Sequence, residues 1–300
     1  MSRRFYSGFV ALIGQPNVGK STLMNCFVGE KISIVSNKPQ TTRNRIRSIL
    51  TGEDYQIVFI DTPGIHKPKN KLGDFMVKSA KFALGEADAV IFMVEPREKI
   101  SEGDKSIIDG FTGMKSPVFL AINKVDTINK PRLLKIIEAY SAAYNFSGII
   151  PLSALNGENT GALLEALRQV LPEGPMYFPD DQITDQPERQ IASEIIREKA
   201  LRYLQEEIPH GLAVEIDSMK SKGSKEDTPV NIRATIFCDK DSHKGIVIGK
   251  DGSMLKKIGT AARLDIQRLL GRTVFLELWV KVKKDWRGND FLLRNFGYKS

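Results

Sequence analysis

The chain has 300 residues, of which 41% are hydrophobic and 27% charged, a composition that suits two globular domains and excludes a disordered or coiled-coil protein. No apolar run approaches the roughly 18 residues of a membrane span, and two cysteines, Cys26 and Cys238, exclude a disulfide-rich secreted fold. We therefore expect a cytoplasmic protein. The net charge of +8 lies in residues 231–300, which contain 15 Lys and Arg but only 7 Asp and Glu. This asymmetry indicates a polyanionic partner or, alternatively, a solvated basic face.

Short apolar runs alternate with helical patterns in the first part of the chain. Strands are predicted at 9–13, 46–50, 56–60, 89–94, 118–122 and 148–151. Helices are predicted between them at 20–28, 75–85, 105–111, 132–144 and 161–170. This alternation predicts an α/β domain with a mostly parallel six-stranded sheet, and the turn at 51–54 predicts one antiparallel hairpin. We assign residues 1–172 to this domain.

Prolines and acidic residues concentrate after the first domain, which predicts a linker at 173–188. A long helix (189–207), two strands (213–219 and 230–238), two helices around a glycine turn and a last strand (273–283) follow. A polar hairpin loop is expected at 220–229. This order predicts a small α+β domain over 189–284, with a tail at 285–300.

A glycine-rich segment directly follows the first strand and precedes the first helix. It fits G-x-x-x-x-G-K-[ST] with Gly14, Gln15, Pro16, Asn17, Val18, Gly19, Lys20 and Ser21. The backbone N–H groups of such a loop surround phosphates at the positive end of a helix. The lysine reaches the β- and γ-phosphates, and the serine hydroxyl binds Mg²⁺. The segment therefore predicts a nucleoside triphosphate site.

A second motif ends the strand at 56–60 and consists of Asp61, Thr62, Pro63 and Gly64. Asp61 is placed to hold the Mg²⁺ shell, and the Gly64 N–H to contact the γ-phosphate. The polar segment 34–43 lies between the two motifs and suits a switch that orders when a threonine meets Mg²⁺. Thr41 and Thr42 are both candidates for this role, and we assign it to Thr42.

A third motif follows the strand at 118–122 and consists of Asn123, Lys124, Val125 and Asp126. The Asp126 carboxylate can accept hydrogen bonds from N1–H and the exocyclic amine of guanine, whereas adenine has no N1–H. Such a site discriminates strongly against a base that lacks the donor. Lys124 can lie along the base, and Ser153 and Ala154 after the last strand can direct the Ala154 N–H to guanine O6. The sequence thus predicts GTP and GDP as ligands.

These motifs resemble those of the translation-factor-related GTPases, within the branch that includes the Era family. Ile65 stands where many GTPases carry a water-positioning glutamine, so intrinsic hydrolysis is expected to be slow. The resemblance implies that K⁺, bound in part by Asn17, supplies positive charge to the reaction. We accordingly assign catalysis to Asn17, Lys20, Thr42 and Gly64, with Mg²⁺ held by Ser21, Thr42 and Asp61.

The basic end of the chain contains a Gly-x-x-Gly pair between two helical patterns. Such a loop allows close approach of a phosphodiester backbone, and neighbouring lysines attract it. The apolar stripe of the following helix is interpreted as core. We expect RNA contacts from Lys244, Ile246, Ile248, Gly249, Lys250, Asp251, Gly252, Lys256 and Lys257.

The α-β-β-α-α-β order resembles a type II KH domain, and with the nucleotide motifs the whole chain resembles the Era family of bacterial GTPases. The resemblance implies binding near the 3′ end of small-subunit ribosomal RNA, a role in maturation of the small ribosomal subunit, and association with the cytoplasmic side of the inner membrane. We expect a monomer. Two alternatives remain: a GTPase of the membrane surface, and an RNA scaffold gated by nucleotide in which hydrolysis is only a slow timer.

Overall fold

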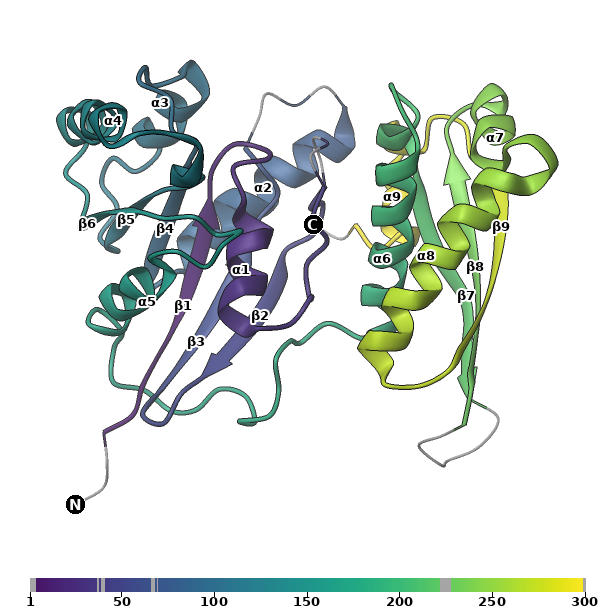
Figure 1. Cartoon of the computed structure of the whole chain (residues 1–300), viewed down its shortest axis with the longest axis horizontal. Coiled ribbons are helices and arrows are strands. Elements are labelled where there is room, and N and C mark those ends of the chain that lie inside the picture. The colour runs from purple at the N-terminus through teal and green to yellow at the C-terminus, as the bar shows by residue number, and fades with distance from the viewer. Residues whose placement is uncertain are drawn as a thin grey trace. The chain divides into compact units, whose positions relative to one another are not determined.

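The computed structural model describes residues 4–36, 38, 41–65, 68, 70–221 and 228–298. The chain forms two compact units, the first ending at Asp185 and the second beginning at Gln186 (Figure 1). Most of the predicted loop at 220–229 lies outside the described residues, as do Asn37, Pro39 and Gln40 of the predicted switch.

The first unit is built on a six-stranded sheet in the order β2-β3-β1-β4-β5-β6. Only the β2–β3 pair is antiparallel, as the turn at 51–54 predicted. The strands are β1 (Tyr6–Ile13), β2 (Ile46–Thr51), β3 (Tyr55–Asp61), β4 (Ala89–Val94), β5 (Val118–Ile122) and β6 (Gly148–Pro151). The predicted fold class is confirmed for this unit.

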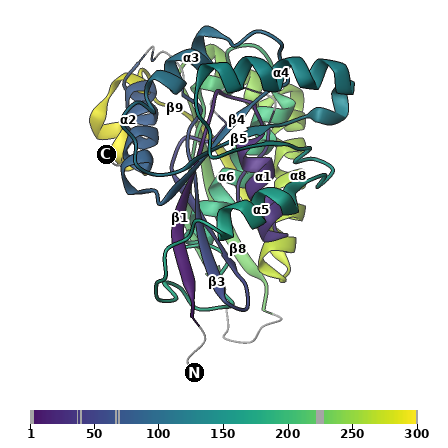
Figure 2. The same ribbon diagram turned by 90° about the vertical axis from the view of Figure 1, so that its left-hand side faces the viewer.

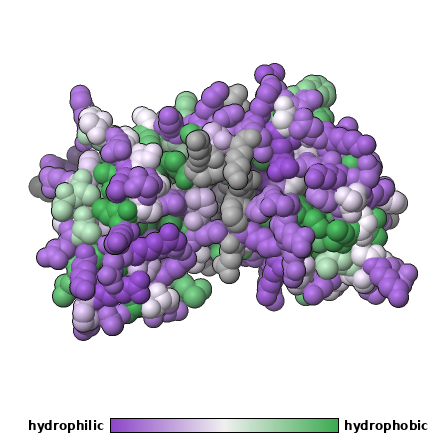
Figure 3. Space-filling model, turned by 90° about the horizontal axis from the view of Figure 1, so that it is seen from above, coloured by the Kyte–Doolittle hydropathy of each residue, from purple (hydrophilic) through white to green (hydrophobic). Residues whose placement is uncertain are grey.

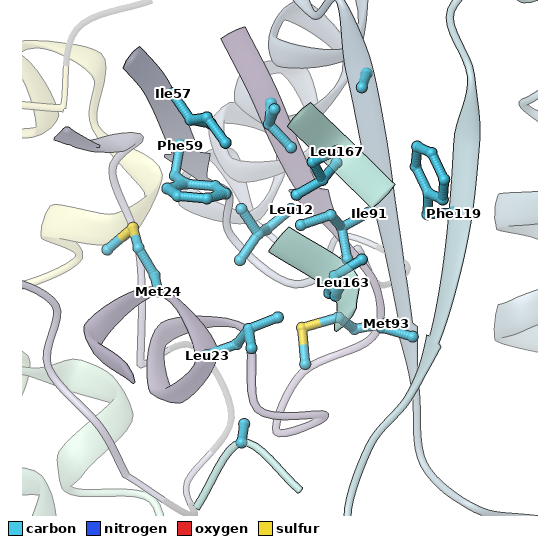
Figure 4. Packing of buried hydrophobic residues seen from close by; sticks show 14 of the residues in the cluster. Leu12, Leu23, Met24, Ile57, Phe59, Ile91, Met93, Phe119, Leu163 and Leu167 are labelled. Atoms are coloured by element: carbon cyan, nitrogen blue, oxygen red, sulfur yellow. The ribbon is translucent and has the colours of Figure 1, made fainter. Parts of the chain in front are cut away.

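Helices cover both faces of the sheet, so its central strands are apolar on both sides (Figure 2). Successive residues of β1 alternate between two cores: Leu12 packs with Leu23 and Leu163, and Ile13 with the cluster that contains Tyr140. Figure 4 shows the first of these cores. The helices are α1 (Lys20–Val28), α2 (Lys71–Glu86), α3 (Glu102–Asp109), η1 (Val125–Thr127), α4 (Lys130–Ala143) and α5 (Thr160–Arg168).

Local capping explains two helix ends that differ from the predicted ones. Ser101 caps α3 by accepting a hydrogen bond from the Asp104 N–H, so the helix begins before position 105. Asn129 caps α4 in the same way through the Arg132 N–H, so this helix begins before position 132. Helix α2 also begins earlier than predicted, at Lys71.

Residues of the predicted linker lie against the first unit. The buried side chain of Gln56 accepts hydrogen bonds from the N–H groups of Tyr177 and Phe178, at 2.8 and 3.0 Å. Further along, the Ile49 N–H donates to the Ile183 carbonyl at 2.9 Å. The chain is thus held by β3 and by the edge strand β2 nearly to the start of the second unit.

The second unit packs its helices on a three-stranded sheet in the order β7-β8-β9, with β7–β8 antiparallel and β8–β9 parallel. Its core includes Ile258, Ala262 and Ile266 at helical spacing along α8. The elements are α6 (Glu188–Tyr203), η2 (Pro209–Gly211), β7 (Ala213–Ser221), β8 (Val230–Cys238), α7 (Asp241–Ile248), η3 (Lys250–Gly252), α8 (Ser253–Leu270) and β9 (Val274–Val282). The predicted small α+β fold is confirmed.

The residues predicted as a tail are folded onto the second unit, with η4 (Trp286–Gly288) and α9 (Asp290–Asn295). Trp286 is fully buried, and its Nε1–H donates to the Gly211 carbonyl at 2.9 Å. Its ring stacks on Tyr298 and meets Phe296 edge to face. This aromatic packing fixes the end of the chain through residue 298.

Candidate functional site

Five parallel strands of the first unit end at the same edge of the sheet, and a predicted motif lies at the end of four of them. The phosphate loop follows β1, the motif at Asp61 ends β3, the motif at Asn123 follows β5 and Ser153 follows β6. Leu12 of β1 is in register with Asp61 of β3, which places these two motifs side by side. Ligands bind at the carboxyl ends of such strands.

The phosphate loop adopts backbone conformations that its sequence permits. Gly19 has φ 106°, and a Cβ there would lie 2.2 Å from Asn123 Nδ2. Asn17 lies in the left-handed region at φ 67°, which asparagine tolerates better than most residues. A glycine is therefore required at position 19, both for its backbone angle and for the space that Asn123 occupies.

Lys20 is buried at the centre of the loop. Its Nζ donates to the carbonyls of Gly14 at 3.1 Å and Gln15 at 2.9 Å. Burial lowers the pKa of the Lys20 ammonium to about 8, partly offset by the negative charge of Asp61. When a nucleotide binds, the Lys20 ammonium can therefore replace its hydrogen bonds to these two carbonyls with hydrogen bonds to phosphate oxygens.

The shifted pKa of Lys20 predicts a pH-dependent affinity for nucleotide. Phosphates favour the charged ammonium, so binding above about pH 8 requires proton uptake, and affinity should fall by up to about tenfold per pH unit. Below pH 7 the affinity should be constant with respect to this group. Calorimetry in two buffers of different ionisation enthalpy should detect uptake approaching one proton at pH 9. The variant Lys20→Met should lose this uptake, and equal uptake in both proteins would contradict the assignment.

Ser21, Thr42 and Asp61 form a cluster of oxygen atoms beside Lys20. The Ser21 hydroxyl donates to Asp61 Oδ2 at 2.7 Å, and the Thr42 hydroxyl lies 2.9 Å from Ser21 Oγ and 3.3 Å from Asp61 Oδ2. Thr41 points elsewhere, with its hydroxyl on the carbonyls of Ser36 and Lys38. Of the two candidate threonines, the structure therefore brings Thr42 to the Asp61 carboxylate.

This cluster fits a magnesium ion. Asp61 Oδ1 is buried and has no hydrogen-bond partner among the residues that the structure describes. Burial raises the pKa of the Asp61 carboxyl, and the charge of Lys20 together with the hydroxyl groups of Ser21, Ser33 and Thr42 opposes this rise. Mg²⁺ prefers oxygen ligands and is usually bound through one or two carboxylates together with substrate phosphates. The three predicted metal ligands thus supply a suitable donor set.

Asn123 joins the phosphate loop to the segment after β6. Its Nδ2 donates to the Val18 carbonyl at 2.7 Å, and its Oδ1 accepts from the Ala154 N–H at 2.9 Å. We expected the Ala154 N–H to meet guanine O6, but in this structure it is engaged by Asn123. The Asn123 amide therefore links the phosphate loop to the segment that follows β6.

Lys124 and Asp126 flank the place expected for the base. Lys124 Nζ donates to the Asn17 carbonyl at 3.0 Å and pairs with Glu95 at 2.5 Å, which extends its stem across the site. Asp126 lies exposed in η1. Within the described part of the chain no hydrogen bond to its carboxylate is found, so that its oxygens are open to a base.

Several predicted residues use their side chains inside the protein. Thr62 donates to the Leu12 carbonyl at 2.6 Å, Ser153 is buried, and Val18 packs in a core. Ile65 packs against the other core, and its N–H donates to the Gly14 carbonyl at 3.1 Å. These residues shape the loops and offer only backbone groups to a ligand. Pro63 is also buried, and Val125 packs partly on the second core.

Three residues that were predicted to contact nucleotide also take part in the packing of the loops: Gln15, Pro16 and Gly64. Gln15 Nε2 donates to Ser101 Oγ at 2.5 Å, at the start of α3. A Cβ on Gly64 would lie 2.6 Å from Pro16 N, so this position must be glycine for the two loops to approach. The Gly64 backbone is thereby kept next to the phosphate loop.

The Gly-x-x-Gly segment of the second unit forms a tight turn between α7 and α8. Gly249, Asp251 and Gly252 have positive φ angles of 76°, 51° and 74°. Lys244 and Lys250 are exposed, Ile246 is 51% exposed, and Ile248 is partly buried. Seen from above, apolar side chains gather at the end of this unit that carries α7, bordered by hydrophilic ones (Figure 3). The predicted loop residues are thus presented together at the surface.

A groove of about 350 Å³ lies beside this turn, between α8 and β9. Lys256 lines it. Lys257, which was also expected to contact RNA, is not among the lining residues and places its ammonium 4.5 Å from the centre of the Tyr203 ring. Of this lining, the sequence indicated only Gly252 and Lys256, because the apolar helix stripe that contains Leu255 was interpreted as core. The lining residues are Gly252, Leu255, Lys256, Gly259, Thr260, Arg263, Leu276 and Leu278.

The fold and the two sites define a P-loop GTPase domain joined to a KH domain. Residues 9–124 match the family described as 50S ribosome-binding GTPase, and residues 207–287 match the KH domain family. The chain is 54% identical to the GTPase Era of Clostridium botulinum (strain Eklund 17B / Type B) and to that of Clostridioides difficile (strain 630), each over 98% of this chain and 99% of the relative. The chain belongs to the Era family of GTPases.

Solved structures of Era agree with this assignment along the whole chain. One is a complex with MgGDPNP and nucleotides 1506–1542 of 16S ribosomal RNA, and another is a single-residue variant of Aquifex aeolicus Era bound to GDP·AlF₄⁻. Each has a TM-score of 0.94 and 41% identity, and the alignment covers 99% of this chain and 100% of the other. The predicted fold, nucleotide class and GTPase activity are confirmed.

Among the described residues, none of the helices has the length and apolar character required to cross a membrane.

Proposed function

We propose that this protein binds the 3′ end of small-subunit ribosomal RNA through its second unit, and that its GTPase cycle serves maturation of the small ribosomal subunit. The observation that carries the proposal is the groove beside the Gly-x-x-Gly turn, in a chain that aligns over 99% of its length with Era bound to nucleotides 1506–1542 of 16S ribosomal RNA. The family description of the first domain names the 50S subunit. That description covers residues 9–124 only and does not include the KH domain. We favour the small subunit because the structure that matches both domains is a complex with 16S ribosomal RNA.

The nucleotide site performs hydrolysis by positioning and charge. The phosphate loop orients the triphosphate, Lys20 neutralises charge on its β- and γ-phosphates, and the Gly64 N–H meets the γ-phosphate. Ser21, Thr42 and Asp61 would hold Mg²⁺, which supplies further positive charge at the phosphates when bound. The Ile65 side chain can form no hydrogen bond to a water molecule, so intrinsic hydrolysis is slow.

We infer that K⁺ near Asn17 supplies the remaining positive charge. The exposed Asn17 lies at the outer turn of the phosphate loop, where its carbonyl already accepts a hydrogen bond from a cation, Lys124. Hydrolysis should be about tenfold faster or more in K⁺ than in Na⁺ at equal ionic strength, since charge compensation dominates this chemistry. In the variant Asn17→Ala the two rates should converge. Equal rates for the unaltered protein in both salts would contradict the proposal.

Two neighbouring lysines of α8 provide a matched test of the RNA groove. Lys256→Glu should weaken binding of RNA 1506–1542 about tenfold and lower the salt dependence, because it places a negative charge in the groove. Lys257→Glu makes the same change in charge one residue away, on the side that faces Tyr203, and should have a much smaller effect. Fluorescence anisotropy at several salt concentrations measures both. An equal loss of RNA affinity in the two variants would indicate that RNA is attracted by the overall charge of the second unit and not by the groove.

Single-turnover kinetics distinguish an enzyme that RNA activates from a scaffold in which hydrolysis is only a timer. We propose the first, in which RNA 1506–1542 accelerates the hydrolytic step. A rate of hydrolysis that is unchanged by saturating RNA would favour the timer.

We also propose that the protein associates peripherally with the inner membrane. The proposal rests on the basic segment 281–287. In the structure, Lys284 pairs with Asp241 at 3.2 Å and Arg287 with Asp239 at 2.5 Å, which reduces the charge available to anionic lipid. Flotation with vesicles that contain anionic lipid tests it, and failure to float would remove it.

A further inference from the structure

Strand β9 presents two different faces at the edge of the second unit's sheet. Val274 and Val280 are buried in the core, together with the partly buried Leu276 and Leu278 between them. The alternate residues point to the opposite side of the sheet. Two of them are aromatic and largely exposed: Phe275 at 58% and Trp279 at 60%.

These rings lie on the opposite face of the edge strand whose other face lines the groove. Leu276 and Leu278 line the groove, and Phe275 and Trp279 alternate with them along the same strand. The strand order β7-β8-β9 leaves β9 at the edge, with no strand paired to its outer side among the described residues. An RNA strand that leaves the groove over this edge therefore meets the aromatic face.

The charges on this face favour a nucleic acid that follows β9. Glu277, between the two rings, is paired with Arg233 at 3.0 Å, and Lys281 follows on the same side of the strand. Strand β7, at the other edge of the sheet, carries the acidic residues Glu215 and Asp217, which would repel the phosphates of an RNA that crossed the sheet from β9 to β7. A protein interface of ordinary type is less consistent with the face, because an ion pair separates the two rings and the centres of such interfaces are depleted in charge.

We propose that Phe275 and Trp279 form a stacking platform for unpaired bases of the single-stranded RNA that leaves the groove. The proposal rests on the proposed function, in which the groove binds RNA. The rings lie four residues apart, roughly 13 Å along the strand, so each contacts a different base. Stacking of this kind tolerates any base, because every base has an aromatic face. The platform thus extends the RNA surface beyond the approximately four nucleotides that a Gly-x-x-Gly loop clamps.

Tryptophan fluorescence tests the contact directly. The chain has two tryptophans, and Trp286 is fully buried, so Trp279 is the one that a base can reach. A single-stranded RNA of about ten nucleotides should quench the emission. In Trp279→Phe the quenching should disappear while affinity is largely retained, since phenylalanine also stacks. Binding by the unaltered protein with no change in emission would overturn the proposal.

Binding measurements with two lengths of RNA separate the platform from the groove. The double variant Phe275→Ala/Trp279→Ala should bind the RNA of about ten nucleotides at least about fivefold more weakly than the unaltered protein. Its affinity for a tetranucleotide should equal that of the unaltered protein. Phe291→Ala removes another exposed ring, 70% accessible on α9, and should change neither affinity. Lys256→Glu should weaken both RNAs.

The outcomes distinguish failure of the platform from failure of the proposed function. If Lys256→Glu weakens both RNAs and the double variant binds the longer one normally, the platform is wrong and the groove stands. If neither RNA binds the unaltered protein, the proposed function fails. A self-association that the double variant abolishes, with RNA binding unaffected, would assign the rings to contact between copies of the chain and overturn the proposal.

Discussion

Replacement of Asp126 by asparagine is expected to reduce the affinity for GTP by about ten-thousand-fold and to create a preference for xanthosine triphosphate. A carboxylate accepts the N1–H and the exocyclic amine of guanine, whereas the asparagine amide offers one acceptor and one donor. Xanthine carries a carbonyl oxygen in place of the amine and so matches the amide. Competition of guanine and xanthine nucleotides for the same protein measures the change.

The structure makes this substitution a clean test. Asp126 is exposed in η1 and has no hydrogen bond from other described residues, so its loss leaves the fold intact. Asp109, exposed at the end of α3, offers a matched control. The variant Asp109→Asn makes the same chemical change away from the site and should bind GTP normally. An unchanged preference for guanine in Asp126→Asn would refute the assignment of the base site.

The nucleotide motifs could be predicted from the sequence because each is local and follows a recognisable strand. The strand before Asn123 is continuous and apolar, and the structure gives β5 the predicted bounds, Val118–Ile122. Once strands are placed in parallel, their carboxyl ends share one edge. The order of motifs along the chain therefore determines which loops meet, without knowledge of any side-chain contact.

Contacts between distant loops could not be predicted in this way. The Asn123 amide joins Val18 to Ala154 only because Gly19 leaves room for it, a relation that involves three separate loops. The same limit applies to the RNA groove. Leu255 and Ile258 both belong to the apolar stripe of α8, yet Leu255 lines the groove while Ile258 is buried. Periodicity identifies the apolar face of a helix but not the edge at which the core ends.

The end of the chain illustrates a further limit. Residues 285–300 have no apolar periodicity long enough to predict their packing, so they were predicted as a tail. The structure instead buries Trp286 through an aromatic cluster and a hydrogen bond to Gly211. Because a single large aromatic residue can bury an area comparable to that of several small ones, a short segment can be held without a regular pattern.

Two adjacent threonines, only one of which reaches Asp61, provide a discriminating test of the nucleotide site. Thr42→Ala should reduce GTP hydrolysis about a hundredfold or more and raise the Mg²⁺ concentration required, because it removes an oxygen from the cluster around Asp61. Thr41→Ala should leave hydrolysis within about threefold, since that hydroxyl donates only to nearby carbonyls. Hydrolysis rates measured across a magnesium titration compare the two directly. The opposite order of effects would mean that the switch segment rearranges when nucleotide binds, so that Thr41 replaces Thr42 beside Ser21.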